Sequence, residues 1–328
     1  MDKIIIGIHG LGNKPSKEIL ERWWIDAMCE GLKKIDKYEF VPKFELAYWA
    51  DILNDKPLAE EITDKENLYF LDEKYVPEPE IIEPRDNSTR ERILNFLEKQ
   101  MDWIFLNDDL TSNFSAISDM VFKKYFKELD IYFTSKRDIP NEIVSIKNNI
   151  RNRLAEVIKK HEGKEILLLS HSMGTIIAFD VCSLMTTDIN IDTFVTMGSP
   201  LGLPIVVSEI AEELKVNNPG LHKLSTPKNI TRSWINYYDL EDSVAINYHL
   251  KDDYIENENK VKVQGINVVN NYEINDEKNP HKSYGYLRTP EFANLLSEFL
   301  VRDRTKLDLW VIKTKEKCVN IYKNLTGK

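Results

Sequence analysis

A polar interruption of an apolar run is the segment of this chain best suited to chemistry. Residues 165–175 read Glu-Ile-Leu-Leu-Leu-Ser-His-Ser-Met-Gly-Thr, and apolar residues resume directly afterwards. This pattern predicts a buried strand that turns sharply into a helix, with a serine exposed at the turn. A serine held in this way attacks an acyl carbon once a neighbouring base removes its proton. Ser172 is therefore the candidate nucleophile.

A second segment near the amino terminus could complete such a site. Residues 3–13 form another apolar, β-branched run, which ends in His9-Gly10 and a loop. Acyl transfer needs N–H donors where negative charge develops on the substrate oxygen. We expect one donor from Met173, the residue after the nucleophile, and another from the loop around Leu11, supported by His9 and Gly10.

Periodicity predicts the elements that must position these loops. Apolar residues recur at helical spacing over residues 20–35 and 143–158, and residues 40–46 favour a second strand. Two further runs rich in β-branched or aromatic residues predict strands over 191–197 and 230–238. Strands that alternate with helices are typical of an α/β protein with a mostly parallel sheet.

With the turn Thr-Met-Gly-Ser-Pro-Leu-Gly-Leu at 196–203, these motifs resemble the α/β-hydrolase superfamily, in particular serine hydrolases of the lipase/esterase type. The resemblance covers roughly residues 1–50 and 140–300, and it implies the α/β-hydrolase fold with a helical cap insertion. The family's usual turn is Gly-x-Ser-x-Gly. Here Ser170 replaces the first glycine, while Gly174 is kept. Because serine is only modestly larger than glycine, we expect the turn to close, with Gly174 as a supporting residue.

The resemblance also implies an acid after the nucleophile, in the loop that follows the strand 230–238. Asp242, followed by Ser-Val, matches the family's common Asp-Pro-Val pattern better than Asp239 does. Asp239 and Glu241 stay open as alternatives, because periodicity does not show which carboxylate points inward.

The base should follow the acid in sequence. Four of the six histidines lie in the first loop, in the serine turn, at a helix end or before the acid, namely His9, His171, His161 and His222. Of the other two, only His281 follows the predicted strand 261–269, whereas His249 precedes it. His281 also precedes a predicted helix over 290–300, which is where the family places its histidine. We therefore expect His281 to be the base.

These residues imply a serine hydrolase that cleaves carboxylic esters, with lipid or acyl esters favoured, through Ser172, His281 and Asp242. A thioesterase, an amidase or an acyltransferase would use the same three residues, and a non-catalytic interaction module is a further alternative. We expect no cofactor and no metal. The sequence holds no His-Glu-x-x-His or Cys-x-x-Cys motif and no phosphate-binding fingerprint.

Composition narrows the class of protein. The chain has 328 residues and a net charge of −10, which disfavours a nucleic-acid partner. Its three cysteines, an odd number, argue against a disulfide framework and favour a reducing compartment. Neither a signal-peptide pattern nor an apolar run of roughly 18 residues is present in the sequence. We expect a cytoplasmic enzyme.

Residues 51–139 are too long for a connecting loop and predict an insertion. Its first part, 51–86, holds twelve acidic residues against four basic ones. A capping box at 88–91 precedes helical patterns over 93–104 and 117–129. The insertion is interpreted either as a lid that shapes an acyl pocket or as helices that only pack on the core.

The carboxyl-terminal residues 301–328 predict an amphipathic helix. They contain eight Lys or Arg against three Asp or Glu. Such a basic helix either lies on an anionic membrane surface, here through residues 304–328, or docks on its own domain.

Overall fold

The computed structural model describes residues 2–37, 41–72, 74–78, 132–133, 142–242, 244–245 and 249–303. The predicted helices over 93–104 and 117–129 lie outside the described residues, and so does the chain beyond 303. The lid and the membrane-binding helix therefore stay predictions. None of the described helices is long and apolar enough to cross a membrane.

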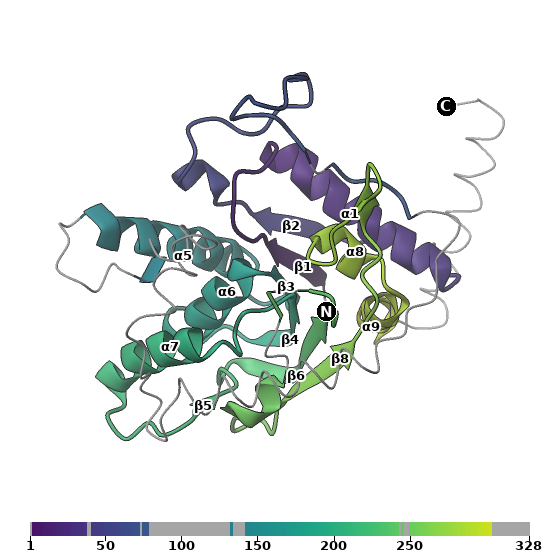
Figure 1. Ribbon diagram of the computed structural model, residues 1–328. Helices are drawn as coiled ribbons and strands as arrows, with labels where there is room; N and C mark the ends of the chain where they lie inside the picture. The colour runs from purple at the N-terminus through teal and green to yellow at the C-terminus, as the bar shows by residue number, and fades with distance from the viewer. Residues whose placement is uncertain are drawn as a thin grey trace.

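A six-stranded sheet with the order β2-β1-β3-β4-β6-β8 forms the centre of the protein, and each pair of neighbouring strands is parallel (Figure 1). The central strands read as continuous apolar runs because helices cover both of their faces. The strands are β1 (Lys3–Ile8), β2 (Phe44–Ala47), β3 (Glu165–His171), β4 (Ile191–Met197), β6 (Ile230–Tyr238) and β8 (Val263–Asn267).

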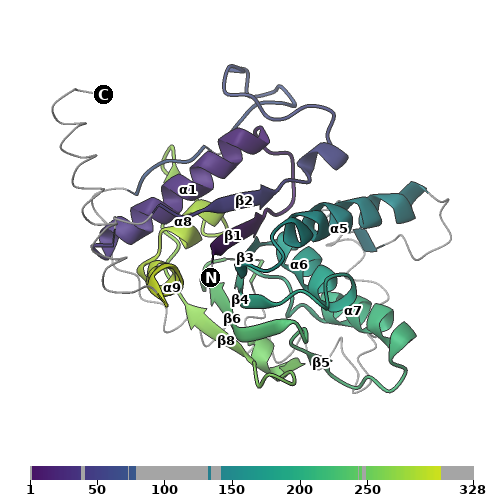
Figure 2. The same ribbon diagram turned by 180° about the vertical axis from the view of Figure 1, so that it is seen from behind.

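Helices lie on both faces of the sheet, and the view from behind shows the same two layers (Figure 2). Alternate strand residues explain this arrangement: Ile5 and Leu167 pack towards one layer, and Ile6 and Leu168 towards the other. The first layer holds α1 (Lys17–Lys34), α8 (Ser283–Leu287) and α9 (Pro290–Val301), and the second holds α5 (Glu142–Lys160), α6 (Met173–Leu184) and α7 (Pro204–Asn217). The protein is thus an α/β protein with a parallel sheet between helices.

The remaining elements are short and belong to the connections. They are the 3-10 helices η1 (Ala50–Ile52) and η2 (Leu250–Asp252), and the strands β5 (Leu224–Ser225), β7 (Tyr254–Ile255), β9 (Glu273–Ile274) and β10 (Glu277–Lys278). Two predicted strands prove shorter than the sequence pattern indicates. The structure has no strand at Val41 and starts β2 at Phe44, and it limits the predicted strand 261–269 to β8.

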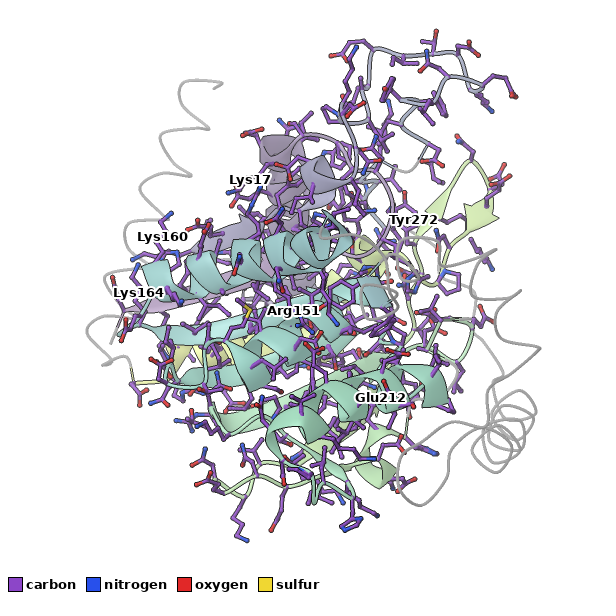
Figure 3. All side chains as sticks on the ribbon, turned by 90° about the vertical axis from the view of Figure 1, so that its left-hand side faces the viewer. Lys17, Arg151, Lys160, Lys164, Glu212 and Tyr272 are labelled. Carbon is purple, nitrogen blue, oxygen red and sulfur yellow. The ribbon has the colours of Figure 1, made fainter. Side chains whose placement is uncertain are left out.

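A buried ionic cluster holds the second helical layer together. Arg151 on α5 contacts Asp180 on α6 at 2.5 Å and Glu213 on α7 at 2.6 Å. Tyr132, from the end of the predicted insertion, donates its hydroxyl to Asp180 at 2.6 Å. Figure 3 shows Arg151 on this helical layer, between the labelled Lys160 of α5 and Glu212 of α7. Because each charge in the cluster has a partner, the polar groups can be buried between three helices.

The first part of the predicted insertion packs against the opposite layer. The side chain of Arg288, fully buried after α8, donates to the carbonyl of Val76 at 2.8 Å. The Tyr75 hydroxyl donates to Glu30 on α1 at 2.7 Å. Residues 74–78 are therefore fastened to the core, as is Tyr132 near the other end of the predicted insertion.

Candidate active site

The predicted strand–turn–helix at Ser172 is present, and its backbone is strained. Strand β3 ends at His171, helix α6 begins at Met173, and Ser172 between them has φ 53° and ψ −132°. Residues other than glycine rarely adopt this conformation, which raises the energy by about 1–3 kcal/mol. The N–H of Ser172 donates to the carbonyl of Met197 at 3.0 Å, which ties the turn to the end of β4. Local strain held by surrounding contacts is characteristic of functional sites.

Small residues on both sides of Ser172 make the turn sterically feasible. A Cβ at Gly174 would lie 2.7 Å from the carbonyl oxygens of both Ile8 and His9, so only glycine fits there. Ser170 is fully buried, and its hydroxyl donates to the carbonyl of Val195 at 2.8 Å. The serine that replaces the family's usual glycine therefore finds both space and a hydrogen-bond partner.

His281 lies against Ser172, although the two residues are far apart in sequence. Its Nε2 is 3.0 Å from the Ser172 Oγ, and its Nδ1 is 2.9 Å from each oxygen of the Asp242 carboxylate. Because a carboxylate only accepts hydrogen bonds, Nδ1 carries the proton and Nε2 is left to accept the serine proton. This arrangement can deprotonate Ser172 and stabilise the imidazolium that results.

Of the three candidate carboxylates, the structure brings Asp242 to His281. Asp242 is buried, and it also accepts from the Tyr286 hydroxyl at 2.7 Å and from the Val244 N–H at 2.9 Å. These three donors, His281 Nδ1, the Tyr286 hydroxyl and the Val244 N–H, hold the carboxylate in one orientation. The pKa of the Tyr286 hydroxyl is raised well above 10, by burial first and then by the charge of Asp242. Tyr286 therefore stays a protonated donor to the carboxylate.

Asp239 organises the loop that carries the acid. Its carboxylate accepts from the N–H of Glu241 at 2.7 Å and from the N–H of Asn270 at 2.6 Å, and its own carbonyl accepts from the N–H of Asp242 at 3.0 Å. Glu241 enters this network through its backbone. Asp239 thus fixes the position of Asp242, which bonds to His281.

His9 holds the loop from which the second oxyanion donor is predicted. Its Nδ1–H donates to the carbonyl of Gly10 at 2.9 Å, and its Nε2 accepts from the N–H of Trp49 at 3.0 Å. The rings of His9 and Trp49 are stacked, with centroids 5.0 Å apart. Burial, followed by the charge of Lys14, lowers the pKa of His9 to about 3. His9 is therefore a neutral residue that braces the loop.

Of the two predicted donors, Leu11 lines the pocket with Ser172, and Met173 directly follows Ser172 in the chain. In a trans peptide the C=O and the next N–H point in opposite directions, so the bond from His9 to the Gly10 carbonyl turns the Leu11 N–H away from His9. Met173 begins α6, where an N–H has no acceptor within its own helix. A Cβ at Gly10 would lie 2.6 Å from the Cβ of Ser172, so the backbone of the loop approaches the serine closely.

The turn at 196–203 makes room for the acid and the base. Gly198 has φ 53°, and a Cβ there would lie 2.7 Å from Asp242 Oδ2 and 3.0 Å from His281 Nδ1. The next residue, Ser199, hydrogen-bonds through its hydroxyl to that of Thr175 on α6, at 2.9 Å. A larger residue at Gly198 would separate Asp242 from His281.

Two residues of this network, His171 and Tyr286, have no role that was predicted from the sequence, apart from the place of His171 in the turn. His171 Nε2–H donates to the carbonyl of His281 at 2.6 Å, and the two rings lie 4.8 Å apart. Burial, and next the proximity of His281, lower the pKa of His171 well below 6.5. The only sequence signal for His171 was its position next to Ser172, and the sequence offers no local signal for Tyr286.

A pocket of about 240 Å³ opens at Ser172 and His281. Its walls include Leu11, Trp24 and Tyr284. Among the described residues, no group of three or more His, Cys, Asp or Glu side chains is arranged to hold a metal ion.

Comparison with known proteins gives no relative on which to base a function: no protein-family model matches the chain, and no curated protein matches it.

Proposed function

We propose that the chain is a serine hydrolase with the α/β-hydrolase fold, and that it cleaves carboxylic esters, with lipid or other acyl esters as the expected group. One observation carries the proposal. The Oγ of Ser172, on a strained turn, lies 3.0 Å from His281 Nε2, and the Nδ1 of the same ring is bound to the buried carboxylate of Asp242. A strained turn and a buried carboxylate both destabilise a fold, and such features cluster at functional sites.

In the proposed reaction, Ser172 Oγ attacks the ester carbonyl carbon while His281 Nε2 takes its proton. The N–H groups of Leu11 and Met173 stabilise the oxyanion. The C–O bond to the leaving group then breaks, and the alcohol leaves with the proton from His281. Water attacks the acyl-enzyme and gives its proton to His281. The bond between the acyl carbon and Ser172 Oγ then breaks, the carboxylic acid leaves, and His281 returns the proton to Oγ.

The first test is labelling of the purified protein with a fluorophosphonate probe, followed by peptide mass spectrometry. We expect an adduct on Ser172 that is lost in Ser172→Ala and in His281→Ala. His222→Ala, which replaces an exposed histidine, is the matched control and should be labelled like the parent protein. A folded protein that does not react would favour the non-catalytic alternative.

A second measurement separates the reactions that share these residues. Hydrolysis is compared for an oxygen ester, a thioester and an amide of the same acyl group, with and without an added alcohol as acyl acceptor. We expect the oxygen ester to have the highest kcat/KM and water to be the main acceptor. A higher kcat/KM for the thioester or the amide would correct the substrate class, and dominant transfer to the alcohol would indicate an acyltransferase.

A further inference from the structure

The pocket at Ser172 differs in charge from the rest of the chain. Two lysines, Lys14 and Lys282, contribute to its wall. Among the described residues, none of the side chains that line the pocket is acidic. The chain as a whole carries a net charge of −10. The entrance to the reactive serine is thus locally basic in an acidic protein.

Specific contacts place both lysines at this wall. Lys14 Nζ donates to the carbonyl of Leu11 and, at 3.2 Å, to that of Gly12, so it stays beside the loop that carries the predicted oxyanion donor. Lys282, next to His281, has its Nζ 5.5 Å from the ring centroid of Tyr284, another wall residue. Both lysines are half-buried, and a charge in such a place is screened less than a charge on the open surface.

The electrostatic effect of the lysines reaches the buried groups of the site. After burial, the charge of Lys14 is a further cause of the lowered pKa of His9. Lys14 and Lys282 both contribute, after burial and His281, to the lowered pKa of His171. A positive potential that opposes protonation of these imidazoles also attracts an anion that enters the pocket.

The remaining wall is partly apolar, and the pocket is small. Leu20 and Trp24 from α1 contribute apolar surface. At about 240 Å³ the pocket is smaller than the roughly 300–1,000 Å³ that is usual for drug-sized ligands. A compact substrate with a short apolar portion and one charged end fits these properties.

We propose that this site selects compact esters that carry an anionic group, a carboxylate or a phosphate, within a few bonds of the ester carbonyl. Lys14 and Lys282 bind the anion, and the apolar wall takes the chain between the anion and the ester. The inference rests on the proposed function, since it assigns a substrate class to the same serine hydrolase site.

The test compares matched esters that differ in charge and by one methyl group. On the acyl side, the 4-nitrophenyl monoester of succinate is paired with its methyl ester. On the leaving-group side, 3-carboxyphenyl butyrate is paired with its methyl ester. In at least one pair we expect kcat/KM to favour the anion by about fivefold or more at low salt, which is the effect of one charge at about 4 Å in water. The preference should decrease as salt is added.

Lysine variants test whether Lys14 and Lys282 cause the preference for anionic esters. Lys282→Met should remove most of it and Lys282→Arg should retain it, because arginine keeps the charge. Lys14→Met should act in the same direction, but Lys14 also bridges carbonyls of its own loop, so Lys282 gives the cleaner result. Lys159→Met removes an exposed charge at the end of α5 and serves as the matched control with unchanged preference.

Equal or lower kcat/KM for the anionic member of both pairs would overturn the inference, as would a preference that Lys282→Met leaves intact. In that outcome the proposed function still stands if hydrolysis of the neutral esters is lost in Ser172→Ala. If no ester is hydrolysed in a manner that depends on Ser172, the proposed function fails and the substrate inference fails with it.

Discussion

The Nε2–H of His171 donates to the backbone carbonyl of His281 at 2.6 Å, and the two imidazole rings lie 4.8 Å apart. His171 directly precedes Ser172. The Oγ of Ser172 is within hydrogen-bond distance of the His281 side chain. Two consecutive residues of one turn therefore contact the backbone and the side chain of His281. The turn that presents Ser172 thus also fixes the loop that carries His281.

Substitution of His171 should reduce the rate of the chemical step while substrate binding changes little. In His171→Met the side-chain volume is roughly kept but the donor is lost, so His281 can move relative to Ser172. Misplacement by about 1 Å lowers rates by up to about 100-fold. We expect kcat per active site to fall about 10- to 100-fold, with a smaller change in KM, as measured by steady-state kinetics after active-site titration.

His171→Gln tests whether the hydrogen bond or the packing matters, because the glutamine Nε2 can still donate to the His281 carbonyl. We expect it to recover a large part of kcat. Thermal unfolding of both variants is the control for folding. If His171→Met and His171→Gln lower kcat equally and also lower stability equally, the hydrogen bond does not matter and His171 only fills space.

Substitution of the three carboxylates in the loop 239–242 should have three different effects on kcat and on stability. Asp242→Asn keeps the shape but removes the charge that fixes the tautomer of His281, so kcat should fall by about 10³–10⁴-fold. Asp239→Asn disturbs the loop through its bonds to Glu241 and Asn270, so it should mainly lower the unfolding temperature. Glu241→Gln should change neither quantity by much. A loss of kcat in Glu241→Gln as large as in Asp242→Asn would contradict the assignment.

Relief of strain at Ser172 should increase stability. Ser172→Gly removes the Cβ that disfavours φ 53°, whereas Ser172→Ala keeps it, and both variants lack the nucleophile. Strain of about 1–3 kcal/mol is offset in part by about 0.5–1 kcal/mol, the entropic disadvantage of glycine in the unfolded chain. We expect Ser172→Gly to unfold at higher urea concentration than Ser172→Ala, by about 0.5–2 kcal/mol. Equal midpoints would mean that the turn stores little strain.

The sequence predicts the elements of this site well because each lies within a short segment. The apolar run that ends at Leu169, just before Ser170-His171-Ser172, predicts both the strand and the turn. In the structure β3 ends at His171 and α6 begins at Met173. The run before His9 likewise predicts β1. Their juxtaposition follows from parallel pairing, since the carboxyl ends of β1 and β3 meet at one edge of the sheet.

Other parts of the site depend on contacts between segments far apart in the sequence. The choice of Asp242 over Asp239 depends on bonds to His281 and Tyr286, about 40 residues further along the chain, which no local periodicity encodes. The role of His171 depends in the same way on the backbone of His281. The pairing of Arg151 with Asp180 and Glu213 appears only when three helices come together. Local patterns thus predict elements, whereas the network around the base requires the folded chain.

His9 should make the stability of the protein depend on pH below about 6.5. In the folded state its pKa is lowered to about 3, chiefly by burial, against an ordinary value of 6.5. The unfolded state therefore binds a proton as the pH falls through 6.5, while the folded state resists protonation until about pH 3. The contribution of His9 to the free energy of unfolding is therefore fully present above pH 6.5. Below pH 6.5 it declines by about 1.4 kcal/mol per pH unit.

The measurement is urea unfolding between pH 7 and pH 4.5 for the parent protein and for His9→Gln, in which position 9 no longer carries a titratable side chain. At pH 7 the variant should be the less stable, because it loses the stack on Trp49 and the bonds to Gly10 and Trp49. The difference between the two proteins should narrow by about 2–3 kcal/mol by pH 4.5, as protonation destabilises only the parent at this position. His222→Gln, at an exposed histidine, should keep the parent's dependence on pH. A gap between parent and His9→Gln that stays constant with pH would show that His9 is not held neutral in the fold.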